Sequence, residues 1–323
     1  MKYMAHRVLQ SFFLLVGVSI LSFLFVELSP GDYFDEMRLT PQISRETVSR
    51  LRTQHGLDQS LPVRYALWLG SVARGEFGFS FAYNTPVSHL LWPRTRNTLI
   101  LTMTATLLAW LVALPLGVLS ADESSKWVDY VISLSTGALS AIPDLLFALG
   151  LLLLAVGTHL LPVGGMTSLG SDDLDMWERT RNLSLHLIGP AVALALASLP
   201  TLVRHTRSAM LEVSNSPYIR AARAHGIPRR RLLLRHALPV ALNPLISLFG
   251  LSVGSLLSAS LLTEVIFSWP GLGPLLLEAI LGRDIYVVIG AVIFASVLLV
   301  FGSLLCDVLL VVADPRIRAG RAA

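Results

Sequence analysis

The chain has 323 residues, of which 54% are hydrophobic and 14% are charged, and its mean hydropathy is +0.66. Its apolar residues come in long uninterrupted blocks, which excludes a soluble protein and places the chain among membrane proteins. The net charge of +4 does not indicate nucleic acid as a partner, because the basic residues flank the apolar blocks, where they set orientation in a membrane. With Cys306 as the single cysteine, an intrachain disulfide is excluded.

Six stretches with few or no charges are long enough to cross about 30 Å of hydrocarbon as helices. The sequence therefore predicts an all-α polytopic membrane protein with six transmembrane helices. These lie near Val8–Leu28, Thr98–Leu119, Pro143–Leu161, Ser184–Val203, Val240–Leu262 and Tyr286–Val312.

The apolar stretch that contains the third predicted span is too long for one straight crossing. As a single helix, residues 127–161 would reach roughly 52 Å at about 1.5 Å per residue. Because proline removes a helical hydrogen bond, Pro143 predicts a break. Residues 127–141 are expected to form a lead-in on the cytoplasmic side or a steeply tilted segment.

Charges flanking the spans predict an orientation in the membrane. Lys2 and Arg7 precede a first apolar run that is too long for a signal-peptide core, so we expect a retained helix with a cytoplasmic N-terminus. Six spans then place residues 204–239 and the basic C-terminal tail inside. The two short outer loops, residues 162–183 and 263–285, carry more acids than bases, which agrees with this orientation.

The connection between the first two spans, residues 29–97, predicts a small extracytoplasmic subdomain. It combines turn signals at residues 29–32, 56 and 61–62 with a helix-like stretch at Ser44–Gln54 and several aromatic residues. We therefore divide the chain into the N-terminus with the first span (1–28), the subdomain (29–97), the transmembrane core (98–312) and the cytoplasmic tail (313–323).

Between Arg204 and Pro239 lies a basic segment with eight arginines and one acid, Glu212. The segment contains the signals that bracket a short helix. Ser216 is expected to cap its N-terminus, Pro217 suits the first helical position, Gly226 suits a left-handed exit, and Pro228 prevents continuation.

Two explanations of this basic segment remain open. The arginines alone fit membrane anchoring and attraction to anionic lipid, worth about 1 kcal/mol per side chain near the surface. Helical geometry favours a docking surface instead, because the side chains of Tyr218, Ala221, Ala222 and His225 share one face at about 100° per residue, away from those of Arg220 and Arg223. Such a narrow ridge can enter a groove on another protein, while the arginines pair with acids on its rim.

No catalytic, cofactor-binding or metal-binding residues are expected in this chain. Neither of its two lysines follows a glycine, so the phosphate-binding loop of ATPases is absent, and the histidines lack the spacing of metal ligands. Asp144 is either a carboxylate satisfied beside the proline break or a gate and pathway residue. Ser252 and Ser255 either line a pathway or pack helices together.

The basic segment resembles a known family motif. Arg220-Ala221-Ala222, three residues, Gly226, nine residues and His236-Ala237-Leu238-Pro239 match the spacing of the EAA loop of ABC-importer permeases, Glu-Ala-Ala-x3-Gly-x9-Ile-x-Leu-Pro. Arg220 replaces the glutamate and His236 the isoleucine, and arginine-rich versions are typical of the peptide and nickel branch.

Further stretches resemble the B-type permease subunit of dipeptide, oligopeptide and nickel importers. Together and in this order they are specific and extend over nearly the whole chain. They are residues 28–32, 56–58 with 61–62, 75–80, 161–165, 263–267 with 269–273, and 314–318.

The resemblance implies a type I ABC importer permease that works with a second homologous permease, two ABC ATPase subunits, an extracytoplasmic binding protein and the lipid membrane. ATP and Mg would bind in the ATPase subunits. The residues implied in coupling to the ATPases are Pro217, Tyr218, Arg220, Ala221, Ala222, Arg223, His225, Gly226, Leu238 and Pro239.

Two points remain open under this resemblance. Trp269, Pro270 and Gly271 either form a turn between the last two spans or touch the binding protein. Peptides are the expected substrate; a nickel complex is the alternative, and a carrier that needs no ATPase is a competing class.

Overall fold

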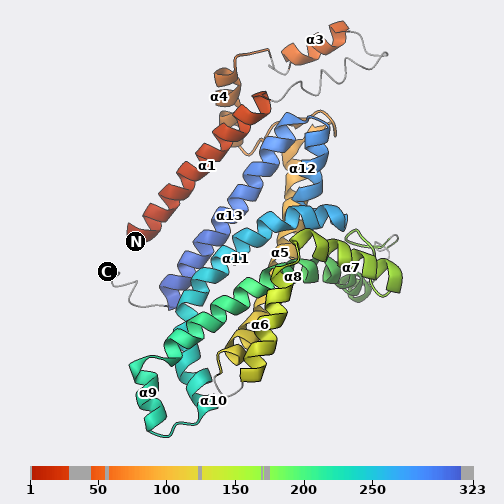
Figure 1. Ribbon diagram of the computed structural model, residues 1–323. Coiled ribbons are helices and arrows are strands. Elements are labelled where there is room, and N and C mark those ends of the chain that lie inside the picture. Colours follow the sequence, from red (N-terminus) through yellow and green to blue (C-terminus); the bar gives the residue numbers. More distant parts are fainter. Residues whose placement is uncertain are drawn as a thin grey trace. The chain divides into compact units, whose positions relative to one another are not determined.

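The computed structural model describes residues 2–28, 45–54, 58–122, 126–168, 170 and 175–313 (Figure 1). Its helices form two compact units, Met1–Thr98 with Pro270–Val300 as unit 1, and Leu99–Trp269 with Phe301–Ala323 as unit 2. The long helices α5 (Val87–Ser120) and α13 (Ile285–Ala313) contribute residues to both. The sequence signals at residues 29–32, 56–57 and 314–318 lie outside the described residues.

Unit 1 is held together by aromatic packing between helices α1 (Lys2–Leu28) and α4 (Leu61–Val72). Phe23 and Trp68 are buried in one cluster with residues of α13, and the hydroxyl groups of Ser19 and Tyr65 are 2.8 Å apart. Helix α3 (Arg45–Gln54) confirms the helix predicted at Ser44–Gln54.

A two-stranded hairpin, β1 (Phe79–Ser80) and β2 (Thr85–Pro86), precedes α5. The buried carboxyl group of Asp284 accepts hydrogen bonds from the Ser80 hydroxyl at 2.6 Å and from the Ala82 amide at 3.2 Å. The Tyr83 hydroxyl donates to Glu278 in helix α12 (Leu272–Leu281). Burial and this bond raise the pKa of Tyr83 to about 12, so the hydroxyl stays protonated and the tie persists at physiological pH.

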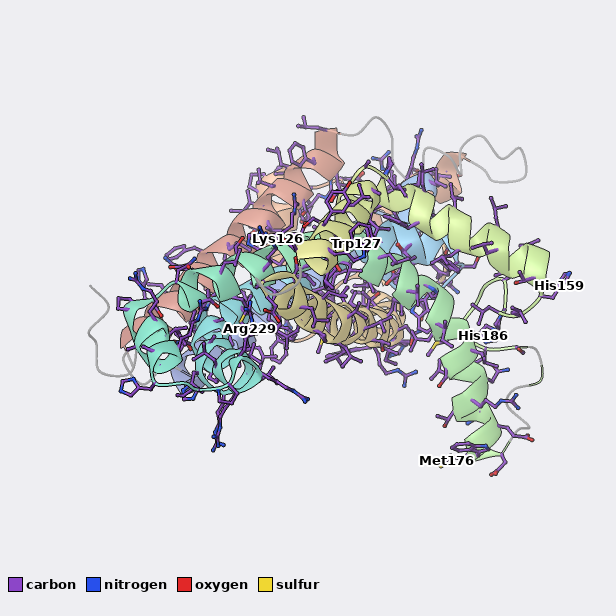
Figure 2. All side chains as sticks on the ribbon, turned by 60° about the horizontal axis from the view of Figure 1, so that its bottom comes forward. Lys126, Trp127, His159, Met176, His186 and Arg229 are labelled. Atoms are coloured by element: carbon purple, nitrogen blue, oxygen red, sulfur yellow. The ribbon has the colours of Figure 1, made fainter. Side chains whose placement is uncertain are left out.

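Unit 2 is built around the long helix α8 (Met176–Ser214), which packs against α11 (Leu238–Ile266), α7 (Asp144–Thr158) and α6 (Lys126–Ser140). Between α8 and α11 lie α9 (Pro217–Ala224), α10 (Arg229–Arg231) and the π-helical turn η2 (Leu232–Ala237). In Figure 2 the labelled Lys126 and Arg229 lie toward one end of unit 2, whereas His159 and Met176 lie toward the other.

The break predicted at Pro143 is confirmed. Helices α6 and α7 are bent by 94° at this point, and Pro143 is the N-cap residue of α7. The described residues contain five helices long and apolar enough to span a membrane, or six when this bent pair counts as one span. The predicted six-helix polytopic fold agrees with the latter.

Helix boundaries differ from the predicted spans, because hydropathy marks only the lipid-facing part of a helix. Polar residues continue helical hydrogen bonding beyond it, so α5 begins at Val87 rather than near Thr98, and α8 runs from Met176 to Ser214. Helix α12 also lies in a segment that was predicted as an outer loop.

Small residues set two close helix contacts in unit 2. A Cβ atom at Gly117 of α5 would lie 2.4 Å from the Cβ atom of Thr206 in α8. A Cβ atom at Gly250 of α11 would lie 2.2 Å from the Cβ atom of Cys306 in α13, whose thiol donates to the Ile246 carbonyl oxygen at 3.0 Å. Larger side chains at either glycine would force the helices apart.

Candidate functional site

The helix predicted in the basic segment is α9, and it begins at the proline that the sequence indicated. Pro217 occupies the start of the helix, where a missing N–H is tolerated. Ser216 is at the N-cap position, but its hydroxyl donates to the Val213 carbonyl oxygen at 2.6 Å and makes no capping bond. The prediction of a side-chain cap is therefore wrong, because the hydroxyl is turned toward a carbonyl oxygen of the preceding turn instead of toward the amides of the first helical turn.

The C-terminal end of α9 is a Schellman turn. Gly226 has a φ angle of 77°, its amide donates to the Arg223 carbonyl oxygen at 3.0 Å, and the Ile227 amide donates to that of Ala222 at 3.4 Å. A Cβ atom at Gly226 would meet nothing within 4 Å, so the glycine is required by backbone conformation alone. Pro228 then begins the next helix as its N-cap residue, which confirms the predicted stop.

The inner face of α9 is anchored by Ile219, of whose surface only 1% is exposed. Ala222 and Ile227 pack against the same apolar cluster from the rim. The cluster joins α9 to the ends of α5 and α8, to η2 and to the start of α11 through Ala121, Ala209, Met210, Leu232, Ala237, Ala241 and Leu245. The short helix therefore sits on four other elements of unit 2.

The outer face of α9 differs in part from the predicted ridge. Tyr218, Ala221 and His225 are exposed, as are Arg220 and Ala224, but Ala222 lies on the inner flank. With Ile219 pointing inward, the outward direction falls between Ala221 and Ala224 at about 100° per residue. Sequence reasoning missed Ile219, although its spacing from Ala222 signals an apolar inner stripe.

The segment after α9 is tied back to it through the π-helical turn. The Tyr218 hydroxyl donates to the His236 carbonyl oxygen at 3.3 Å. Pro239 has no N–H to offer the Arg235 carbonyl oxygen four residues earlier, and the chain forms a π-turn over these residues. Leu238 packs against the apolar cluster, whereas Pro239 is exposed.

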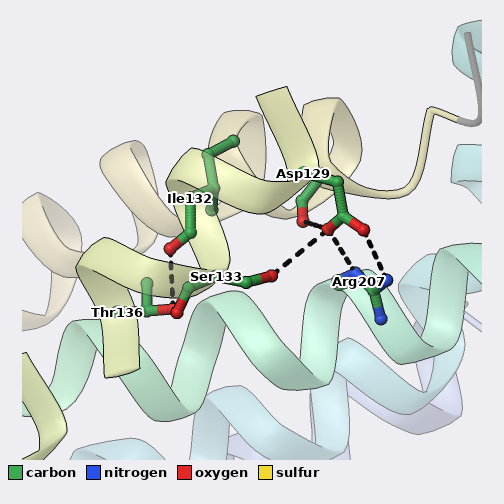
Figure 3. A network of polar contacts seen from close by, with 6 residues as sticks. Asp129, Ile132, Ser133, Thr136 and Arg207 are labelled. Carbon is green, nitrogen blue, oxygen red and sulfur yellow. Dashed lines mark hydrogen bonds and ion pairs between the residues drawn. The ribbon is translucent and has the colours of Figure 1, made fainter. Parts of the chain in front are cut away.

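Two ion pairs connect the end of α5 and the start of α6 with α8 and α10, the elements before and after α9. Arg207 of α8 donates from Nε and Nη2 to the two carboxylate oxygens of Asp129 in α6, at 2.7 and 2.8 Å (Figure 3). Ser120 and Ser133 also donate to this carboxylate. Arg229, after α9, pairs with Asp122. The segments on both sides of α9 are thus held by acids near the α5–α6 connection, and the two parallel bonds of Arg207 fix its geometry.

The three predicted pathway residues come together in unit 2. Asp144 at the start of α7 and Ser252 and Ser255 on α11 line one cavity of about 340 Å³ together with residues of α8. Among the described residues, no three histidine, cysteine, aspartate or glutamate side chains gather in a group that could hold a metal ion.

The predicted contact residues after α11 are packed into the protein. Trp269 is fully buried and packs in a cluster with Leu101, Ala191 and Leu256. The Pro270 carbonyl oxygen accepts a hydrogen bond from the Asn97 side-chain amide at 2.8 Å, and Gly271 is the N-cap residue of α12. These placements fit a turn, and Trp269 has no exposed surface for a binding protein in this structure.

Comparisons with known proteins agree with this geometry. Residues 113–319 match the family described as binding-protein-dependent transport system inner membrane component. The chain is 39% identical over 317 residues to the oligopeptide transport system permease protein AppB of Bacillus subtilis, with 98% of each chain covered. It is 36% identical over 323 residues to the dipeptide transport system permease protein DppB of Escherichia coli K12, with 94% of each covered.

A solved structure shows the same fold. Inward-facing MetNI, a methionine ABC transporter, matches with a TM-score of 0.58 and 18% identity over 70% of this chain and 96% of that one. The long apolar helices and the family match together make this chain a multi-pass membrane transport subunit. It belongs to the family of binding-protein-dependent transport system inner membrane components.

Proposed function

We propose that this chain is a permease subunit of an ATP-driven importer that moves peptides across the inner membrane by alternating access. The single observation that carries the proposal is α9, a short helix with a buried anchor, Ile219, and an outward face of small side chains around Ala221. Such a face fits a groove on a separate ATPase subunit.

The contacts of α9 support a mechanical role. A displacement of α9 is passed to α5, α8 and α11 through the apolar cluster, because close-packed side chains transmit movement as a body. The ion pairs of Asp129 and Asp122 extend this connection to the α5–α6 turn and thus to the bent pair α6 and α7. Closure of the ATPases would in this way change the arrangement of the spanning helices.

The proposed partners follow from this role. They are a second homologous permease, two ABC ATPase subunits that bind ATP and Mg, and an extracytoplasmic protein that delivers the substrate. This chain would bind no cofactor of its own and would keep both termini in the cytoplasm, on the side of α9.

Peptides are the proposed substrate because the named relatives are an oligopeptide and a dipeptide permease, each similar over nearly its full length. A nickel complex and an ATPase-independent carrier are the alternatives. The relatives do not favour nickel, and a docking helix such as α9 has no evident use in a carrier that works alone.

Purification followed by reconstitution tests this proposal. The chain, expressed with the neighbouring transporter genes and purified in mild detergent, is expected to bring down a second permease and two ATPase chains. In proteoliposomes with the binding protein, it should take up dipeptides only when ATP is supplied to the α9 side. Uptake by this chain alone without ATP would contradict the importer, and ATP-driven uptake of nickel but not of dipeptides would contradict the substrate.

A further inference from the structure

The cavity of unit 2 is formed where three helices meet at the break between α6 and α7. Its walls are the start of α7, the middle of α8 and the middle of α11, and its volume is about 340 Å³. Small-molecule sites range upward from about 300 Å³, so this space suits one end of a small peptide rather than an extended chain.

The serine hydroxyls of the cavity offer hydrogen-bond acceptors rather than donors, because their hydrogens are bonded to backbone carbonyl oxygens. The hydroxyl of Ser198 donates to the Ala195 carbonyl oxygen at 3.1 Å, and that of Ser255 donates to the Ser252 carbonyl oxygen at 3.0 Å. A serine hydroxyl has one hydrogen and two lone pairs, so both oxygens retain acceptor capacity after these bonds.

The hydroxyl of Ser252 is also used by bonds within the protein, both as donor and as acceptor. It donates to the Phe249 carbonyl oxygen at 2.7 Å and accepts from the indole N–H of Trp110 at 3.0 Å. Trp110 therefore fixes the serine rotamer, and its own donor is used up by that bond. These three serines therefore present no free donor to the cavity, whereas the exposed Thr201, which also lines it, has a hydroxyl that can rotate to donate or to accept.

Asp144 supplies the charge. It is the first residue of α7, it is exposed, and it lines the cavity from the N-terminal end of that helix. Among the described residues that line the cavity, none is basic. One anionic group and several acceptor oxygens therefore face a space bordered by Leu251 and Leu256.

We propose that this cavity binds the protonated α-amino group of a peptide during its passage, with Asp144 as its counter-ion and Ser198 and Ser255 as additional acceptors. A free α-amino group has a pKa of about 7.7–8.0 and carries three donors when protonated, which matches a wall with one acidic residue, several acceptor oxygens and no basic side chain. The leucine side chains then take the aliphatic part of the first residue. This inference rests on the proposed peptide import and names the part of the substrate that this chain recognises.

Charge-selective labelling of the assembled transporter tests the site directly. Ser255→Cys places a thiol on the cavity wall. Its rate of modification is measured with a cationic methanethiosulfonate, which carries a trimethylammonium group, and with an anionic one, which carries a sulfonate group. Each rate is divided by the rate of the same reagent with a free thiol in solution. We expect the cationic reagent to be favoured about tenfold, equivalent to about 1.4 kcal/mol. Modification is read by mass on this chain, and the parent protein, with buried Cys306, gives the background.

A control variant at a second acidic residue distinguishes an effect of the cavity from a general effect of the protein's charge. Asp144→Asn in the Ser255→Cys background should abolish the preference for the cationic reagent. Asp175→Asn should preserve it, because Asp175 also lies at a helix N-terminus, capping the Met176 amide at 2.7 Å, but does not line the cavity. Equal rates for both reagents before the Asp144 change, or no modification in any nucleotide state because a second chain fills the space, would overturn the proposal.

Ligand protection identifies the group that is recognised. Millimolar dialanine should slow modification of the introduced thiol, whereas N-acetyl-dialanine should not. Equal protection by both, or by neither, contradicts recognition of the amino group.

Uptake separates this inference from the proposed function. Asp144→Asn should lower ATP-driven dialanine uptake at least about tenfold and Asp144→Glu should restore part of it, since a carboxylate is kept. Absence of dialanine uptake by the unmodified transporter would count against the import function. Normal dialanine uptake by the Asp144→Asn variant would contradict the role proposed for the cavity without contradicting the import function.

Discussion

Helix α9 and the cavity of unit 2 are both built from a few short contacts, but the contacts are of different kinds. The inner face of α9 is apolar and closed, with Ile219 buried in a cluster drawn from four other elements. The cavity is open and is lined by serine hydroxyls whose hydrogens are bonded to backbone carbonyl oxygens and which keep acceptor capacity.

The difference matches what each region is proposed to do. A helix that transmits a displacement must be in close contact with its neighbours, and close packing of apolar side chains provides this contact. A site that binds and releases a cation needs acceptors that exchange between water and ligand at small cost. Substitutions at α9 should therefore affect ATPase binding, whereas substitutions in the cavity should affect uptake while α9 stays in place.

The largest expected effect follows removal of the α9 anchor. Ile219→Ala should destabilise the seating of α9 by about 2–5 kcal/mol, because it deletes buried methyl groups from a closed cluster. Amide hydrogen exchange over residues 217–227 should become faster, and ATP-driven uptake should be lost. Leu234→Ala, at a side chain that is 48% exposed in the adjacent turn, is the control and should leave exchange nearly unchanged.

A change in the cavity wall should be smaller and should act elsewhere. Ser252→Ala leaves the half-buried indole N–H of Trp110 without its acceptor, which costs about 1–3 kcal/mol when such a donor stays out of reach of water. Thermal unfolding of the purified transporter should occur at lower temperature. Exchange over residues 217–227 should not change, and faster exchange there would show that the two regions are not independent.

The turn after α9 offers a test of backbone conformation alone. Gly226→Ala should cost about 1–2 kcal/mol, because the left-handed φ angle is unfavourable for a residue with a Cβ atom and no neighbouring atom interferes. Gly226→Asn should cost less, since asparagine tolerates this conformation. Exchange at the Ile227 amide, which closes the turn, measures both; equal rates in all three proteins would contradict this account.

The ion pair between Asp129 and Arg207 should contribute least. Both side chains are partly exposed, at 29% and 36%, so a double-mutant cycle with Asp129→Asn and Arg207→Gln should give a coupling energy of about 1 kcal/mol or less. The coupling should weaken as salt is raised. Arg207→Lys should not restore it fully, because an ammonium group cannot reproduce the two parallel hydrogen bonds.

The sequence predicted α9 well because its ends depend on local backbone chemistry. Pro217, Gly226 and Pro228 each restrict the chain in a way that neighbours hardly alter, and all three occupy the expected positions. The hydroxyl of Ser216 is different, because it can accept from an amide of the first turn or donate to a carbonyl oxygen of the preceding turn, and it does the latter. The inward side of the helix differs from the prediction, because the pattern of small residues places Ala222 on the outer ridge, whereas Ile219 and Ala222 face the apolar cluster.

The cavity and the ion pairs were beyond what the sequence could predict. Asp144, Ser252 and Ser255 were singled out separately, but only the 94° bend at Pro143 brings the start of α7 to α11. The acids Asp122 and Asp129 were available as partners for the basic segment, yet which arginine each one meets depends on how α5, α6 and α8 pack. Composition alone could not choose among eight arginines.

The most direct test of the central claim is co-purification of the ATPase chains with a variant altered on the outward face of α9. Ala221→Arg places a bulky charge at that face without touching the buried anchor, and Ala73→Arg introduces the same side chain at an exposed alanine that ends α4 in unit 1. The account predicts that Ala221→Arg retains the second permease but loses the ATPase chains and ATP-driven uptake, while Ala73→Arg retains the ATPase chains. Full retention of both ATPase chains and of uptake by Ala221→Arg would contradict it.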